Sequence, residues 1–99
     1  MKDKFGGSPV TVSGVAWYRR EQWALLKSVA KDAGELENSY DEWLEFAEPA
    51  FEAIRNTGTH LMKVDVDIEE LIQWCKHEGR PVDGPARADF VTRKMKDND

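Results

Sequence analysis

The pattern of apolar residues predicts a strand followed by two helices, and this order occurs twice along the chain. Residues 10–18, VTVSGVAWY, are rich in β-branched and aromatic residues, which is typical of a strand. In residues 20–33 apolar side chains recur at helical spacing, and Gly34 stands where a left-handed C-cap would end a helix. The first strand is therefore expected to lead directly into a helix.

A second helix is predicted to begin at Ser39, because Ser39 and Glu42 have the spacing of a capping box. Pro49 stands in its middle and predicts a kink or a restart of the helix, since proline removes one backbone hydrogen bond, and the apolar stripe that continues past it favours the kink. The helix is expected to end near Asn56, with Gly58 as the terminator. Its predicted apolar stripe consists of Trp43, Phe46, Ala47, Ala50, Phe51 and Ile54.

The second strand is predicted over residues 59–66, where Met62, Val64 and Val66 alternate with more polar residues. Asp67 follows as a helix N-cap, and Glu70 at the third helical position completes a variant of the capping box. The helix that it begins has a predicted buried stripe of Ile68, Leu71, Ile72 and Cys75.

Gly79 is the predicted end of this third helix, and a short turn through Pro81 leads to a fourth. Asp83 or Gly84 is expected to cap the fourth helix, because either suits an N-cap and Pro85 is tolerated in a first turn. Phe90, Val91 and Met95 are the residues expected to anchor it.

This β-α-α-β-α-α order predicts a small, helix-rich α/β domain, with α+β as the alternative class. Residues 10–96 are expected to form a single domain, with residues 1–9 as a flexible lead-in and residues 97–99 as a frayed end. Because two strands alone make a marginal sheet, we expect a homodimer whose sheet continues into the second copy.

Charge narrows the possible functions. The chain has 99 residues and a net charge of −5, and residues 32–52 contain eight acidic side chains and no lysine or arginine. Such a segment repels phosphate, so nucleic-acid binding is not expected. No apolar run approaches the roughly 20 residues of a membrane span, and the one cysteine cannot form an internal disulfide. These features predict a soluble, cytoplasmic protein that does not enter the membrane.

The strongest candidate for partner binding is Trp17, Tyr18, Arg19 and Arg20, where the first strand ends. Tryptophan, tyrosine and arginine are enriched in binding hot spots. The alternative is structural, because large aromatic side chains are usually buried and arginines are usually solvated.

Carboxylates are concentrated at residues 65–70, where the second strand meets the third helix. An EF-hand is excluded, because Glu70 and Lys76 stand where its loop requires glycine and glutamate. A simpler metal site of Asp65, Glu69 and His60 is a possible basis for enzyme activity, although helix capping and solvation explain the same carboxylates. No catalytic motif is found, so we assign no catalytic residue and no cofactor.

Several segments resemble a family of small uncharacterised bacterial proteins over about residues 15–92. The segments are VAWYR at 15–19 followed by Trp23, YDEWL at 40–44, KVDVD at 63–67, Leu71, WC at 74–75, GRPV at 79–82 and ARADF at 86–90. Pro49 departs from the uninterrupted helix of that family. The resemblance implies no activity. The sequence therefore favours an interaction or self-association module, with a metal-assisted enzyme and a nucleic-acid-binding module as alternatives.

Overall fold

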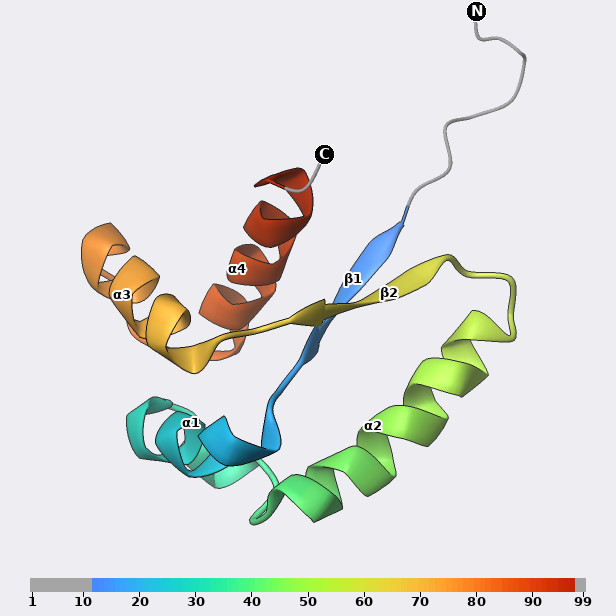
Figure 1. Ribbon diagram of the computed structural model, residues 1–99, viewed down its shortest axis with the longest axis horizontal. Helices are drawn as coiled ribbons and strands as arrows, with labels where there is room; N and C mark the ends of the chain where they lie inside the picture. The colour runs from blue at the N-terminus through green and yellow to red at the C-terminus, as the bar shows by residue number, and fades with distance from the viewer. Residues whose placement is uncertain (1–11, 98–99) are drawn as a thin grey trace, which may run out of the picture.

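A two-stranded parallel sheet forms the centre of the computed structural model, which describes residues 12–97 (Figure 1). Strand β1 (Ser13–Trp17) pairs with β2 (Leu61–Asp65) in a register that runs from Ser13 opposite Leu61 to Trp17 opposite Asp65. The mixed helix and strand class is therefore confirmed, and so is the order of elements. The predicted lead-in at residues 1–9 and residues 98–99 lie outside the described residues, as does the start of the predicted first strand.

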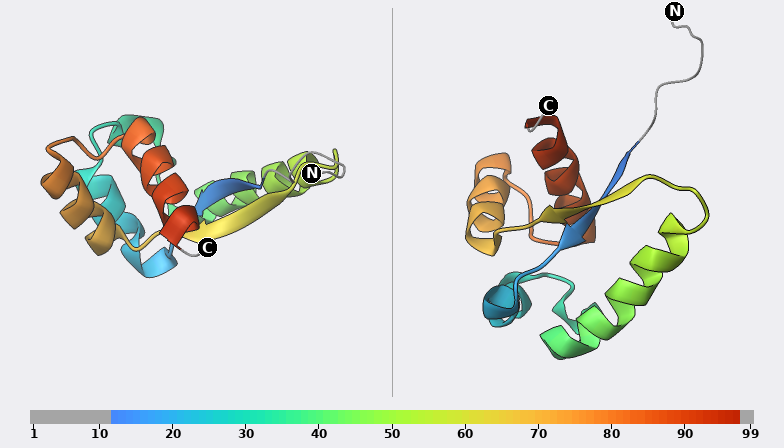
Figure 2. Two further views of the ribbon diagram at one scale, coloured as in Figure 1. Left: turned by 90° about the horizontal axis from the view of Figure 1, so that it is seen from above. Right: turned by 45° about the vertical axis from the view of Figure 1, so that its right-hand side comes forward.

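Helices cover the two faces of this sheet (Figure 2). Gly14 lies under α4 (Gly84–Asp97), because a Cβ atom placed on it would meet Val91 and Met95. Trp17 is an odd-numbered residue of the same strand, so its side chain points to the opposite face. There it contacts Trp43 and Phe51 of α2 (Tyr40–Arg55). The result is a small three-layer arrangement of helix, sheet and helix.

The predicted continuous helix over residues 20–33 is wrong. A single 3₁₀ turn, η1 (Arg20–Gln22), precedes α1 (Trp23–Val29), and a second one, η2 (Ala33–Glu35), follows it. Ala30 is extended, with ψ at 128°, and the next amide, that of Lys31, donates a 2.7 Å hydrogen bond to the Val82 carbonyl. This contact with a distant segment ends the helix early. Gly34 is not in the left-handed region, so it is not the predicted C-cap.

Helix α2 begins as predicted but buries fewer side chains than predicted. The Ser39 hydroxyl accepts a hydrogen bond from the Glu42 amide, whereas the Glu42 carboxylate accepts one from the Asn38 amide instead of that of Ser39. The helix continues through Pro49 without a restart. Phe46 and Ile54 are 66 % and 48 % exposed, which corrects the predicted stripe. A sheet of only two strands covers a narrow sector of the helix, so the sides of α2 stay in solvent.

The boundaries of the two later helices follow the predicted signals, but the predicted capping box at Asp67 is incomplete, because the Glu70 carboxylate accepts a hydrogen bond from Lys94 and none from the Asp67 amide. Asp67 caps α3 (Ile68–Glu78) by accepting hydrogen bonds from the first-turn amides of Glu69 and Glu70. Gly79 ends α3 in the left-handed conformation, with φ at 68°. Of the two residues proposed to cap α4, Asp83 is the one that accepts the hydrogen bond, from the Ala86 amide. These boundaries were predictable because each depends on residues within one helical turn.

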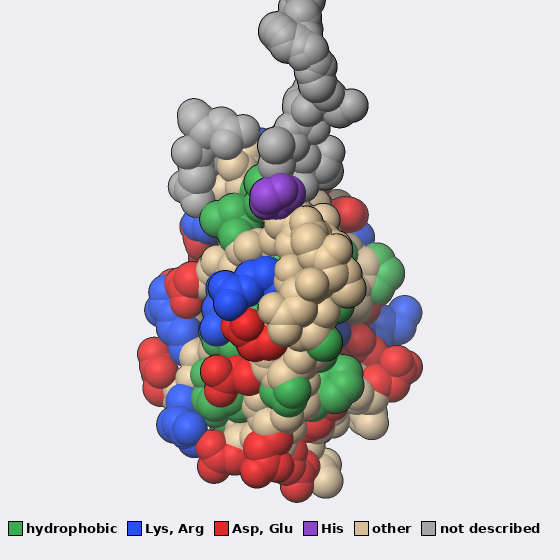
Figure 3. Space-filling view, turned by 90° about the vertical axis from the view of Figure 1, so that its right-hand side faces the viewer, with side chains coloured by type: hydrophobic (Ala, Val, Ile, Leu, Met, Phe, Trp, Pro, Cys, Tyr) green, Lys and Arg blue, Asp and Glu red, His purple; other side chains and the backbone are tan. Residues whose placement is uncertain are grey.

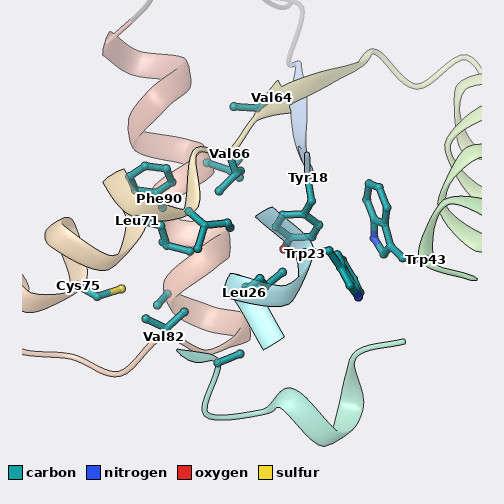
Figure 4. Packing of buried hydrophobic residues seen from close by; sticks show 14 residues of the cluster. Tyr18, Trp23, Leu26, Trp43, Val64, Val66, Leu71, Cys75, Val82 and Phe90 are labelled. Carbon is teal, nitrogen blue, oxygen red and sulfur yellow. The ribbon is translucent and has the colours of Figure 1, made fainter. Parts of the chain in front are cut away.

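The core lies where α1, α3 and α4 meet the end of the sheet (Figure 4). Leu26, Val66, Ile68 and Leu71 are fully buried there. A cluster of aromatic rings joins this centre to α2 and contains Trp17, Tyr18, Trp23, Tyr40, Trp43 and Phe51. Aromatic side chains bury large areas, so this cluster is a main source of packing energy in so small a domain. Among the described helices, none is long and apolar enough to cross a bilayer.

Candidate functional site

The aromatic members of the predicted partner site lie in the core. Tyr18 is 8 % exposed and packs against Trp23 and Trp43. Trp17 is half-buried and lies edge-on to Trp43, with 5.0 Å between ring centroids. Burial raises the pKa of the Tyr18 phenol, and the nearby Arg87 guanidinium opposes that effect. Both rings therefore have a structural use, and their role in partner binding stays a prediction.

The two arginines of that predicted site are held by carboxylates. Arg19 donates two hydrogen bonds to Asp65, at 2.6 and 3.0 Å, and lies 3.7 Å from Asp67. Arg20 pairs with Asp41 at 2.8 Å, and its guanidinium lies 4.7 Å from the centre of the Tyr40 ring. Asp65 also raises the pKa of Arg19, so this side chain is a permanent cation at the end of β2.

The predicted metal ligands do not meet at one point. His60 precedes β2 and Asp65 ends it, so about five residues of strand, or roughly 16 Å, separate them. Asp65 is instead paired with Arg19, and Glu69 is an exposed residue of the first turn of α3. Within residues 12–97 no group of three or more His, Cys, Asp or Glu side chains is close enough to hold a metal ion. These three residues therefore cannot share one ion in this conformation.

The other carboxylates of residues 65–70 also have structural partners. Asp67 accepts a 3.1 Å hydrogen bond from the Gln22 side chain, whose oxygen accepts one from the Ile68 amide. The pKa of Asp67 is lowered, mainly by the hydrogen bond from the Gln22 side chain. Glu70 accepts a 3.0 Å hydrogen bond from Lys94. The carboxylate cluster therefore fixes the start of α3 against η1 and α4.

Cys75 has no features of a nucleophile. The residue is 2 % exposed and belongs to the core, as its place on the apolar stripe predicts. Burial raises the pKa of its thiol, so the reactive thiolate is disfavoured.

The outer edge of β2 is the feature with the clearest capacity for binding. The Ser13 amide donates to the His60 carbonyl, and the Val66 amide donates to the Trp17 carbonyl. Because backbone groups alternate in direction along a strand, even-numbered residues of β2 face β1 and Leu61, Lys63 and Asp65 face away. Among the described residues no backbone hydrogen bond reaches these three, and no third strand is present. The edge therefore offers free donors and acceptors.

This edge lies in a cleft of about 320 Å³. Consecutive residues 62–65 line it, together with Arg19, Asp67, Glu70 and Lys94. The Lys63 ammonium lies 4.2 Å from the centre of the Trp17 ring, which holds it on the α2 face. The cleft thus combines unpaired backbone with side chains of both charges. Such an edge can accept an additional strand.

The sequence predicted an open sheet edge, but it did not indicate which edge or which residues would form it. The alternation of Lys63 and Asp65 on one face of the second strand was the available signal. It could not be interpreted without the strand partner and the register, because these decide which backbone groups remain free. The exposure of Phe46 and Ile54 was missed for a similar reason, since it depends on how much of α2 the sheet covers.

Comparison with protein-family models, with curated proteins and with solved structures finds no match to this chain. The resemblance to small bacterial proteins therefore stays a prediction, and the function has to be inferred from the free β2 edge and the surfaces around it.

Proposed function

We propose that this protein is a self-associating interaction module in which β2 pairs with β2 of a second copy. The observation that supports the proposal is the free outer edge of β2, which lies in a cleft and has no partner among residues 12–97. A two-stranded sheet is marginal by itself, and pairing across a two-fold axis would produce a four-stranded sheet. We also propose that the protein is bacterial and cytoplasmic, as its sequence resemblance and its composition predict.

The charges on the edge favour one register. Two copies related by a two-fold axis pair their β2 strands antiparallel, with residues of like parity opposite each other. A register centred on Val64 places Lys63 opposite Asp65 of the second copy, and the symmetric pair forms as well. A register centred on Lys63 would place two ammonium groups opposite each other, which is destabilising. The edge is therefore self-complementary in the first register.

Lys63→Pro tests this pairing. Proline removes the amide of Lys63, which faces outward, and leaves the hydrogen bonds between β1 and β2 in place. Sedimentation velocity should show a dimer for the wild-type protein and a monomer for Lys63→Pro, with circular dichroism to confirm that the variant is folded. Lys63→Ala is the matched control, because it keeps the amide and should stay dimeric.

Lys63→Glu provides a second test that does not strain the backbone. It places a carboxylate opposite Asp65 of the second copy, so the variant dimer should dissociate more readily than the wild-type dimer, and the difference should be largest at low salt. A wild-type protein that stays monomeric at high concentration would overturn the proposal. So would folded Lys63→Pro and Lys63→Glu variants that both dimerise as the wild-type protein does.

A further inference from the structure

The outward side of α2 carries two parallel rows of side chains. One is an apolar strip of Phe46, Pro49, Ala50 and Ala53, which spacings of three and four residues place on one side of the helix, with the exposed Ile54 beside its C-terminal end. The other is an acidic row of Asp41, Glu45, Glu48 and Glu52, with spacings of four, three and four. The core-facing side of the same helix is formed by Trp43, Ala47 and Phe51.

The apolar strip is unusual because it is in solvent. Phe46 is 66 % and Ile54 48 % exposed, and they are two of the four large hydrophobic residues exposed among residues 12–97. Pro49 and Ala53 are also exposed, and Ala50 is half-buried. The face of the molecule that carries α2 shows hydrophobic and acidic side chains next to each other (Figure 3). Apolar patches bordered by polar residues are typical of interaction sites.

The acidic row determines what can cover the strip. Asp41 and Glu52 pair with Arg20 and Arg55, whereas no ion pair within the described residues involves Glu45 or Glu48. A depression of about 340 Å³ lies along this row between Asp41 and Pro49. A second α2 helix, a nucleic acid or an anionic bilayer would each bring more negative charge against it. A segment rich in lysine and arginine would neutralise it.

We infer that the outward side of α2 is a docking surface for a cationic amphipathic helix of another protein. The apolar stripe of that helix would cover Phe46 and its neighbours, as in helix-in-groove recognition. Its lysines or arginines would face Glu45 and Glu48. This surface is separate from the β2 edge, so the inference does not depend on self-association.

A synthetic amphipathic helix of leucine and lysine is the probe, and its binding to the full chain is measured by calorimetry. Wild-type protein should bind it, and a leucine and glutamate peptide of the same pattern should not bind. A lysine peptide without the apolar stripe should bind much more weakly. The two control peptides test the two rows separately. The glutamate peptide lacks the positive charge that the acidic row would attract, and the lysine peptide lacks the apolar stripe that would cover the apolar strip.

Variants then locate the site. Phe46→Ser and Glu45→Lys should each weaken binding by about tenfold or more, because each removes a central contact. Both residues are exposed, so the fold should be kept. Glu78→Lys, an exposed position on α3, makes the same change in net charge and should leave binding unchanged.

The inference is overturned if Phe46→Ser and Glu45→Lys bind the peptide as the wild-type protein does. It is also overturned if Glu78→Lys weakens binding equally, since bulk charge would then explain it. Loss of the dimer in Phe46→Ser would instead identify a second copy as the occupant. Lys63→Pro should bind the peptide normally, so failure of the proposed self-association and failure of this inference can be told apart.

Discussion

At the scale of single residues, the pair of Arg87 and Asp32 is the most consequential contact. Arg87 is 8 % exposed and donates two hydrogen bonds to Asp32, at 2.9 and 3.0 Å. The partners are 55 residues apart and join the segment after α1 to the first turns of α4. The buried Arg87 guanidinium needs such bidentate geometry, because a charge without a partner is costly to bury, whereas the Asp32 carboxylate is half-buried.

This pair predicts a specific dependence of stability on pH. The hydrogen bonds from Arg87 are the main cause that holds the pKa of Asp32 below its ordinary value of 3.8. The unfolded chain therefore takes up the proton more readily. The stability from Asp32 is fully present above about pH 4 and is lost as the pH falls through the lower pKa of the folded state.

Asp32→Asn should lower the free energy of unfolding at neutral pH by about 1.5–3 kcal/mol, the usual range for hydrogen bonds to charged groups. Denaturant titrations at pH 7 and near pH 3 measure this, and the difference from wild-type protein should shrink at the lower pH. The control is Asp41→Asn, whose exposed pair with Arg20 should contribute at most about 1 kcal/mol. A difference that stays constant with pH would contradict the assignment.

At the scale of elements, the contact between β1 and α4 depends on Gly14. A Cβ atom on this residue would lie 2.8 Å from Val91 and 3.1 Å from Val64, and would also meet the sulfur of Met95. Glycine weakens a strand by itself, so its presence here reflects the close approach of the helix. The sheet can be covered on this face only because one position has no side chain.

Gly14→Val should therefore destabilise the protein by about 1–3 kcal/mol through overpacking, although valine favours strands. Ser13→Val is the matched control at the neighbouring, exposed strand position and should change stability by less than about 0.5 kcal/mol. Thermal and denaturant unfolding of both variants checks this. Equal effects from the two substitutions would show that α4 does not press on Gly14.

At the scale of the whole molecule, one core unites four helices with a sheet that has too few strands to be independently stable. The aromatic cluster packs α2 against one face of the sheet, and Val91 and Met95 pack α4 against the other face. The faces are covered, whereas the outward backbone groups of both strands have no partner among the described residues, and those of β2 lie in a cleft. The proposed dimer would complete this arrangement by adding strands and not by adding another layer.

If the sheet is completed in this way, the melting temperature should rise with protein concentration, because association stabilises only the folded chain. Calorimetric scans over about a hundredfold range of concentration would show the shift for the wild-type protein. Lys63→Pro should melt at a temperature that does not depend on concentration. A constant melting temperature for a wild-type protein that is dimeric would mean that the dimer does not support the fold.

The order of elements and most of the helix boundaries were predictable from the sequence. Ser39, Asp67, Asp83 and Gly79 act on backbone groups within one helical turn, so the information needed to place them is local. The buried stripe of α3 was also predictable, because its periodicity coincides with the side that meets the core. The candidate metal site and the partner site were suggested by residue type, which does not show where a side chain points.

Contacts between distant segments set where α1 stops, which side chains of α2 stay in solvent and which backbone groups of the sheet lie in a cleft. Lys31 reaches Val82, and Asp32 reaches Arg87, across more than half of the chain. Such contacts depend on how distant elements pack, and hydrophobic periodicity reports only that a helix has an apolar side. The surfaces proposed for binding are the parts of the chain that this packing leaves uncovered.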